Sequence, residues 1–195
     1  SNSSYAFAGG LAAYAHNVKI ENVTVSGNVD AQSQYYGISG GVVGVVYTDS
    51  SYNESILLNV SNQATVKAKS DAGGIAGDTL STRITNATNK GAVQGERRIG
   101  GIVGSARTQT YMEDVTNHGA ITITGSGTGG GISGTLHVFS YIKNALNDGD
   151  VTSSSPSVRT GGITGTLNNV TIMDSQNKGK VTNTGENSDG GGIAG

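Results

Sequence analysis

A five-residue pattern, Gly-Gly-aliphatic-x-Gly, recurs along the chain and constrains the fold more than any other feature of the sequence. It reads GGVVG, GGIAG, GGIVG, GGISG, GGITG and again GGIAG, after a degenerate first copy, GGLAA. The first glycines of the copies are Gly9, Gly40, Gly73, Gly100, Gly130, Gly161 and Gly191. Successive copies are 31, 33, 27, 30, 31 and 30 residues apart. A period in this range indicates a repeat architecture in which each unit stacks on the next.

A second repeated element, a block of ten residues, lies between the glycine motifs and aligns without gaps. Its copies begin at Ile20, Leu57, Ile84, Met112, Ile142 and Ile172. The first position is always apolar, the third is Asn or Asp, and the tenth is Val or Ile; the sixth is Asn and the eighth is Gly in five of six copies. The sequence therefore predicts one domain over residues 1–195, with repeats at approximately 9–39, 40–72, 73–99, 100–129, 130–160 and 161–190 and the start of a seventh at 191–195. Because that last unit is incomplete, we expect the chain to be a fragment of a larger protein.

The short apolar segments of each unit predict β-strands. Val, Ile and Thr are common, and Gly, Asn, Asp and Ser separate the apolar segments as turn residues do. We expect three short strands per unit, one of them the GGI-x-G segment itself. Such strands bury a core only when each pairs in parallel with its counterpart one coil away. The sequence thus predicts an all-β, right-handed parallel β-helix (β-solenoid) of about six coils of roughly 30 residues.

Equivalent positions of successive coils are predicted to form ladders of stacked side chains. One ladder is the isoleucine of the glycine motif: Ile75, Ile102, Ile132, Ile163 and Ile193. Another is the sixth position of the block: Asn62, Asn89, Asn117, Asn147 and Asn177. We expect these asparagines at a corner, where Asn tolerates a left-handed backbone and its amide can both donate to and accept from its neighbours. Glycine in the motif is expected where backbones turn or approach too closely for a Cβ atom.

Composition argues against several classes of function. The net charge is -2 and only 13% of residues are charged, so the sequence gives no general attraction to nucleic acid. No stretch approaches the roughly 20 apolar residues of a membrane span, so we expect no membrane insertion. The chain has no cysteine, which excludes disulfides and thiolate metal sites. No cofactor is expected.

The core "G-[IL]-x-G", followed some eleven residues later by "I-x-N-x-x-N-x-G-x-V", resembles the GLUG repeat. That resemblance covers nearly the whole chain in six copies. It implies a secreted or cell-wall-attached bacterial protein, such as the non-catalytic repeat region of IgA-specific zinc metallopeptidases or an adhesin-like protein. The expected location is extracellular.

Residues that could carry catalysis or bind metal are few and dispersed. The motif HExxH is absent, and His16, His118 and His137 are isolated in the sequence. The best acidic and basic candidates for a carbohydrate-active site are Asp148, Asp150, Asp174, Lys143, Lys178 and Lys180. Asp148 and Asp150 flank a turn glycine, where aspartate is ordinary turn chemistry. We therefore predict no catalytic residue, no metal site and no enzyme activity.

Tyrosines give the one candidate for ligand binding. Six of eight lie in the first 52 residues, and four of these flank the second glycine motif: Tyr35, Tyr36, Tyr47 and Tyr52. The segment that follows this motif is also longer than in the other coils. Two interpretations stay open: the tyrosines lie on two loops that flank one strand and stack on a sugar or protein partner, or they cap the first coil against edge pairing.

The predicted function is a scaffold or adhesion module with a rod-like shape. Its expected partners are a surface protein or glycan of a host or bacterium, together with neighbouring domains of the same chain. The alternatives are a glycan-binding module, an accessory region of an IgA-type metallopeptidase and, last, a carbohydrate-active enzyme. A glycan binder would need exposed rings, whereas an enzyme would need paired carboxylates on one face.

Overall fold

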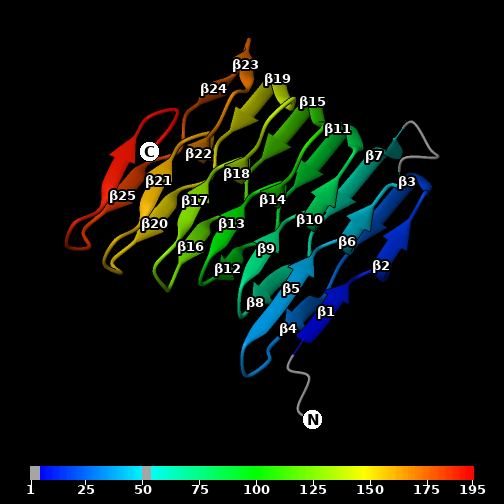
Figure 1. Cartoon of the computed structure of the whole chain (residues 1–195), viewed down its shortest axis with the longest axis horizontal. Coiled ribbons are helices and arrows are strands. Elements are labelled where there is room, and N and C mark those ends of the chain that lie inside the picture. The colour runs from blue at the N-terminus through cyan, green and yellow to red at the C-terminus, as the bar shows by residue number, and fades with distance from the viewer. Residues whose placement is uncertain (1–4, 50–53) are drawn as a thin grey trace.

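The chain folds into a β-solenoid of parallel strands, with no helix in the part described (Figure 1). This computed structural model describes residues 5–49 and 54–195. Each complete coil contributes one strand to each of four sheets, here named A, B, C and D in chain order, and every strand pairs in parallel with the equivalent strand of the neighbouring coils. The predicted β-helix of about six coils is confirmed. The prediction of three strands per coil is wrong, because there are four.

Sheets A and B follow one another directly in each coil. The strands of sheet A are β1 (Tyr5–Gly9), β5 (Tyr36–Gly40), β9 (Asp71–Gly73), β13 (Arg98–Gly100), β17 (Thr128–Gly130), β21 (Arg159–Gly161) and β26 (Asp189–Gly191). The strands of sheet B are β2 (Ala12–His16), β6 (Val43–Tyr47), β10 (Ala76–Leu80), β14 (Val103–Ala106), β18 (Ser133–Leu136) and β22 (Thr164–Leu167).

Sheets C and D complete the coil and contain most of the ten-residue block. The strands of sheet C are β3 (Lys19–Val25), β7 (Ser55–Asn62), β11 (Thr82–Asn89), β15 (Thr110–Asn117), β19 (Tyr141–Asn147) and β23 (Thr171–Met173), with β24 (Gln176–Asn177) also pairing with β19. The strands of sheet D are β4 (Asn28–Ala31), β8 (Thr65–Ala68), β12 (Val93–Gly95), β16 (Ile121–Ile123), β20 (Val151–Ser153) and β25 (Val181–Asn183).

The glycine motif is a corner between two strands and not a strand itself, which is why the prediction missed one strand per coil. Its first glycine ends a strand of sheet A and its fourth residue begins a strand of sheet B. A Cβ atom added to that first glycine would lie only 1.6 to 2.1 Å from the carbonyl oxygen of the fourth residue in every copy. The corner is therefore too tight for any residue except glycine.

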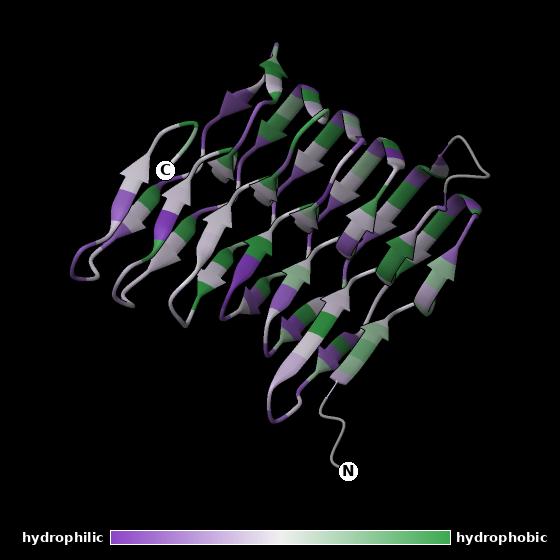
Figure 2. Ribbon diagram, viewed as in Figure 1, coloured by the Kyte–Doolittle hydropathy of each residue, from purple (hydrophilic) through white to green (hydrophobic). Residues whose placement is uncertain are grey.

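The predicted ladders of apolar side chains form the interior of the solenoid. Figure 2 shows hydrophobic residues recurring along successive strands. Ile75, Ile102, Ile132 and Ile163 are fully buried, and each donates its backbone N–H to the carbonyl of the isoleucine one coil further on, at 2.9 Å. Ile193 accepts the last of these bonds, but its side chain in the final coil is 44% exposed. The first and tenth block positions stack in the same way, as in the pairs Ile84–Met112 and Val93–Ile121.

An uninterrupted asparagine ladder runs along the interior, as predicted. Asn62, Asn89, Asn117 and Asn147 each donate from Nδ2 to Oδ1 of the asparagine in the next coil, at 2.8 Å, and the series ends on Asn177. Each also donates to the carbonyl two residues ahead, at 2.8 to 2.9 Å. Oδ1 of Asn117 accepts the N–H of Gly119 at 3.2 Å as well, so this amide uses its full hydrogen-bonding capacity while buried.

The asparagine ladder also explains the second glycine of the motif. A Cβ atom on Gly101 would lie 2.3 Å from Cγ of Asn117, and a Cβ atom on the equivalent glycine of each other coil from the second onward would lie 2.2 to 2.4 Å from Cγ of its own asparagine. In the first coil, where Val25 replaces asparagine, the same place is filled by the valine side chain against Gly10. The two sequence motifs are thus two halves of one packing contact.

The left-handed backbone predicted for the ladder asparagines belongs to another position of the block. Positive φ values of 48° to 57° occur at the third block position, in Asn22, Asn59, Asn86, Asp114, Asn144 and Asp174. In β7 this residue stands between inward-facing Leu57 and Val60, so it shifts the inward–outward alternation by one residue and bends the strand. Asn and Asp are favoured there because they tolerate this conformation better than other non-glycine residues. The ladder asparagines are favoured instead by their amide hydrogen bonds.

Candidate functional site

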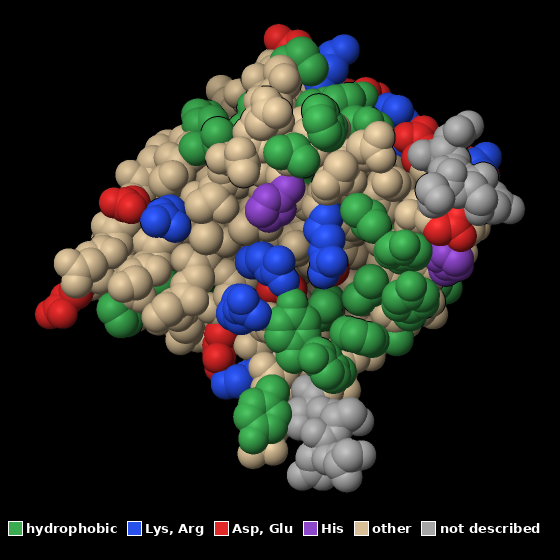
Figure 3. All heavy atoms as spheres, viewed as in Figure 1, with side chains coloured by type: hydrophobic (Ala, Val, Ile, Leu, Met, Phe, Trp, Pro, Cys, Tyr) green, Lys and Arg blue, Asp and Glu red, His purple; other side chains and the backbone are tan. Residues whose placement is uncertain are grey.

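The strongest cluster of chemically capable side chains lies on the outer surface of sheets A and B, here called the A–B face. It consists of Tyr5, Phe7, Tyr36, Asp71 and Arg98 from sheet A with Tyr14, His16, Tyr47, Asp78 and, just beyond β14, Arg107 beside sheet B. Figure 3 shows hydrophobic side chains gathered over the N-terminal coils of this face, with basic side chains and a histidine next to them.

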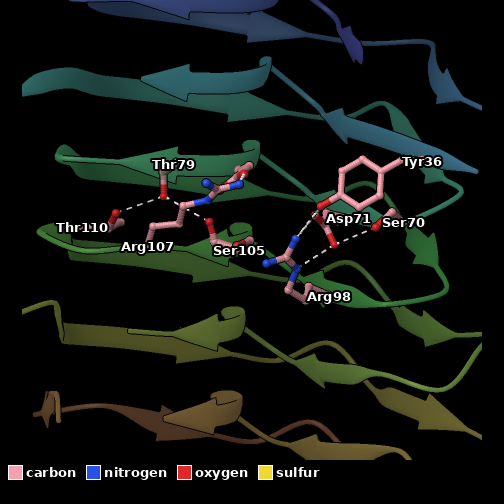
Figure 4. Close-up of polar contacts among 9 residues, drawn as sticks. Tyr36, Ser70, Asp71, Thr79, Arg98, Ser105, Arg107 and Thr110 are labelled. Atoms are coloured by element: carbon pink, nitrogen blue, oxygen red, sulfur yellow. Dashed lines mark hydrogen bonds and ion pairs between the residues drawn. The ribbon is translucent and has the colours of Figure 1, made fainter. Parts of the chain in front are cut away.

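Two ion pairs connect neighbouring coils on this face (Figure 4). Arg98 donates from Nε to Oδ1 of Asp71 at 2.8 Å and also contacts Oδ2, while Arg107 makes the same two-bond contact with Asp78. Asp71 is fully buried and Asp78 is 3% exposed. The side chain of Arg107 is about half exposed, so this guanidinium is the accessible member of the two pairs.

Tyr36 ties the aromatic part of the face to the first ion pair. Its hydroxyl donates to Oδ2 of Asp71 at 2.8 Å and accepts from Nη2 of Arg98 at 2.6 Å. The ring packs edge-on against Tyr5, with centroids 5.8 Å apart, and the guanidinium of Arg97 lies 5.6 Å from its centroid. Burial and the adjacent Asp71 carboxylate raise the pKa of Tyr36.

The other rings of the face are more exposed. Tyr14 is 54%, Phe7 43% and Tyr47 38% exposed, and Tyr47 stacks on His16 with centroids 5.3 Å apart. A small hollow of about 70 Å³ joins Tyr14 and Tyr47 to Asp78, Leu80 and Arg107. The exposed rings and the accessible guanidinium therefore border one concave surface.

Three hydroxyl groups in this region are buried and have no hydrogen-bond partner: Ser105 Oγ, Thr128 Oγ1 and Thr135 Oγ1. Ser105 pairs in register with Asp78 on one side and with Thr135 on the other, so Asp78, Ser105 and Thr135 lie in one row across sheet B. Thr128 is the register neighbour of Arg98 in sheet A. A buried hydroxyl without a partner costs about 1 to 3 kcal/mol, so these groups mark an incompletely satisfied polar surface.

The charges of the face also perturb the titration of its members. Burial raises the pKa of Asp78 and outweighs the opposing effect of Arg107. Burial, together with the positive charges of Arg98 and Arg107, lowers the pKa of His137, which follows β18 in the next coil. Burial opposes the charge of Arg98, but the hydrogen bonds and charge of Asp71 prevail and raise the pKa of that guanidinium.

The structure only partly brings together the tyrosines singled out from the sequence. Tyr36 lies at the start of β5 and Tyr47 at the end of β6, so both belong to strands of the A–B face and not to two loops. Tyr35 precedes β5 and is 68% exposed. Tyr52 lies outside the described residues.

The isolated histidines and the acidic candidates do not converge on one site. His118 and Asp148 form an exposed pair across neighbouring coils, with Nδ1 and Oδ2 3.0 Å apart. Asp150 accepts the backbone N–H of Lys180 at 2.8 Å, whereas Asp174 occupies the strand bend with a φ of 48°. Within residues 5–49 and 54–195, no group of three His, Cys, Asp or Glu side chains could hold a metal ion.

Sequence reasoning missed Tyr5, Phe7, Tyr14 and both aspartate–arginine pairs. A signal for the first pair is present in the sequence, since Asp71 and Arg98 both stand two residues before their glycine motifs. The coil register makes these two residues direct neighbours. Asp78 and Arg107 stand one and three residues after their motifs, so their offsets give no such signal.

Comparison with known proteins supports the fold. The structure is similar to a solved structure of an IgA1 Protease, with a TM-score of 0.66 and 14% sequence identity. The likeness covers 91% of this chain but 14% of that chain, so this chain spans about one seventh of the length of its structural neighbour. No protein-family model and no curated protein matches the sequence. Among the residues described, no helix is long and apolar enough to cross a membrane.

Proposed function

We propose that the chain is a non-catalytic repeat module of a larger bacterial surface or secreted protein, working outside the cell as a rigid scaffold and adhesion module. The observation that carries this proposal is the combination of a continuous, hydrogen-bonded interior ladder with an exposed aromatic face. The ladder holds five successive coils, from Asn62 to Asn177, in register, which suits a rigid support. The exposed rings of Tyr14 and Phe7 suit a contact with a partner.

The dimensions suit a block within a longer array better than a free-standing rod. Seven strands of sheet A, spaced about 4.8 Å apart, span about 29 Å, whereas an eight-residue strand such as β7 spans about 26 Å. The solenoid is therefore about as long along its axis as one of its longest strands is across it. In this proposal its reach comes from further coils or neighbouring domains of the same protein.

A second candidate is an accessory region beside the catalytic part of an IgA-type metallopeptidase. The fold likeness to IgA1 Protease favours it, as does the resemblance of the repeat to the GLUG motif. Both candidates place the chain in a supporting role next to other domains. They differ in whether the neighbouring domain cleaves a substrate.

Adhesion is tested with the purified chain, fluorescently labelled at an introduced cysteine, on panels of mammalian cells and bacterial cell walls. Since the native chain has no cysteine, a single label at the exposed Ser154, directly after β20 of sheet D, leaves the A–B face unmodified. We expect saturable binding that the unlabelled chain competes away. Binding that does not saturate, or that denatured chain reproduces equally, would refute an adhesive role.

The proposed absence of catalytic activity is tested by prolonged incubation of the chain with immunoglobulin A1 and with a panel of polysaccharides. We expect no peptide-bond cleavage and no release of reducing sugar. Turnover that rises with protein concentration would overturn this part of the proposal. Substituting Asp148 or Asp150 by Asn would then show whether the acidic corner is responsible.

A further inference from the structure

We propose that the A–B face binds an uncharged glycan chain that runs along the solenoid axis, with the exposed rings stacking on sugars and the ion pairs bonding their hydroxyls. This inference rests on the proposed adhesive function and names the class of ligand. It moves the binding site from the predicted tyrosine loops to the outer surface of two sheets.

The aromatic end of the face supplies flat apolar surfaces at successive coils. Phe7 and Tyr14 lie on the first coil and Tyr47 on the second, all more than one third exposed. Pyranose rings carry C–H groups on their faces and hydroxyls at their rims, so they combine apolar stacking on a ring with polar contacts at its edge. Neighbouring coils are about 4.8 Å apart, a step similar to the length of one sugar in an extended chain.

The polar part of the face begins where the rings end. The hollow that contains Tyr14 and Tyr47 also contains Asp78 and the half-exposed guanidinium of Arg107. Each carboxylate of this region, Asp71 and Asp78, is already paired with a guanidinium. The charges cancel within each pair, and Arg97 beside Tyr36 adds one positive charge. The surface therefore offers donors and acceptors with a small net charge, which suits hydroxyl groups better than a polyanion.

The unpartnered hydroxyls provide an independent sign of a missing polar partner. Ser105 and Thr135 are at least nine-tenths buried, yet their oxygen atoms bond to nothing among the described residues. They lie in the same row as Asp78, directly along the path from the aromatic end. A glycan that shifts the half-exposed guanidinium of Arg107 would bring hydroxyls to these groups and satisfy them.

Affinity electrophoresis tests the inference with defined polysaccharides cast in native gels. The neutral probes are β-glucan, mannan, xylan and galactan, and the charged probes are polygalacturonate and heparin. We expect at least one neutral polysaccharide to retard the chain, with little change between 50 and 300 mM salt. Retardation by charged probes alone, abolished by salt, would overturn the uncharged ligand in favour of simple charge attraction.

Variants locate the site on the A–B face. Tyr14→Ser combined with Tyr47→Ala should weaken retardation at least tenfold, and Arg107→Gln alone should weaken it several-fold. The matched control is Tyr141→Ala. Tyr141 stacks on Tyr111 in sheet C, with ring centroids 4.9 Å apart, so this substitution removes a similar ring contact from another sheet. The melting temperature of every variant is measured, so that weaker retardation caused by lost binding is separated from weaker retardation caused by unfolding. Equal loss in the control, or no loss in the A–B variants, would refute the assigned site.

A final arm separates this inference from the proposed function. Cells that bind the chain are treated with periodate, which destroys sugar rings and leaves protein surfaces largely intact. Loss of binding supports the glycan. Unchanged binding would overturn the glycan inference in favour of a protein partner, while the adhesive function would stand.

Discussion

Removal of one amide from the interior ladder should destabilise the protein far more than removal of an amide from its outside. Asn117 is fully buried and forms four hydrogen bonds, to Asn89, Asn147 and both backbone groups of Gly119. Asn117→Ala leaves the N–H and the carbonyl of Gly119 without these bonds and breaks both amide links. At about 1 to 3 kcal/mol for each of the two orphaned Gly119 groups, we expect a loss of about 2 to 6 kcal/mol in the free energy of unfolding.

The matched control is Asn86→Gly, which removes an amide from the outer row. Asn86 donates to Asn59 at 2.6 Å on the exposed side of sheet C. Its φ of 54° is one that glycine adopts without strain. Because water replaces the lost bond, we expect a loss below about 1 kcal/mol.

Urea unfolding followed by circular dichroism measures both variants, and hydrogen exchange at the Gly119 amide reports the ladder itself. Asn117→Ala should lower the urea midpoint strongly and accelerate exchange at Gly119, whereas Asn86→Gly should do neither. If Asn117→Ala cost no more than Asn86→Gly, the ladder would be a consequence of the fold and not a source of its stability.

Three further predictions concern single positions. Gly101→Ala should unfold the protein or lower its melting temperature severely, because a Cβ atom there would lie 2.1 Å from a backbone carbonyl oxygen and 2.3 Å from Cγ of Asn117. A normal melting curve would contradict the close approach. Phe139→Asn should stabilise the protein by roughly 0.5 to 1 kcal/mol, because Phe139 is 68% exposed and has a φ of 59° that asparagine tolerates better. A lower melting temperature of the variant in calorimetry would refute this reasoning. The pKa of His137 is lowered in the folded state, so its contribution to stability is present above pH 6.5 and is lost as the pH falls through the folded pKa. Between pH 7.5 and 5, the free energy of unfolding of His137→Asn should therefore fall less than that of the native protein. Identical pH profiles of the two proteins would exclude this residue as the cause.

The sequence predicted the stacked parts of the fold because they repeat with the coil. The asparagines from Asn62 to Asn177 and the isoleucines from Ile75 to Ile163 recur about once per coil, and parallel stacking places such residues over one another. The third block position shows the limit of this reasoning. Its conserved spacing was visible within the chain, but the left-handed bend at residues such as Asn86 depends on how each strand turns around the core.

The candidate site was less accessible from sequence because its residues do not repeat. Asp71 and Arg98 differ in type but occupy one row, and Tyr36 joins them from the coil before. A search for identical residues at a fixed period does not detect a row in which oppositely charged residues pair between coils. The predicted Tyr36 and Tyr47 therefore identified two strands of the face without its ion pairs.

The sequence by itself determined that this protein is a stack of parallel coils with glycine corners and a buried asparagine row, since each requirement recurs locally in every unit. The tertiary structure alone decided that the glycine motif bends the chain between two sheets, and that outward side chains from different coils meet beside that bend. The physical reason is that a repeat encodes contacts between equal positions, whereas a surface site depends on unlike positions brought together by register and curvature.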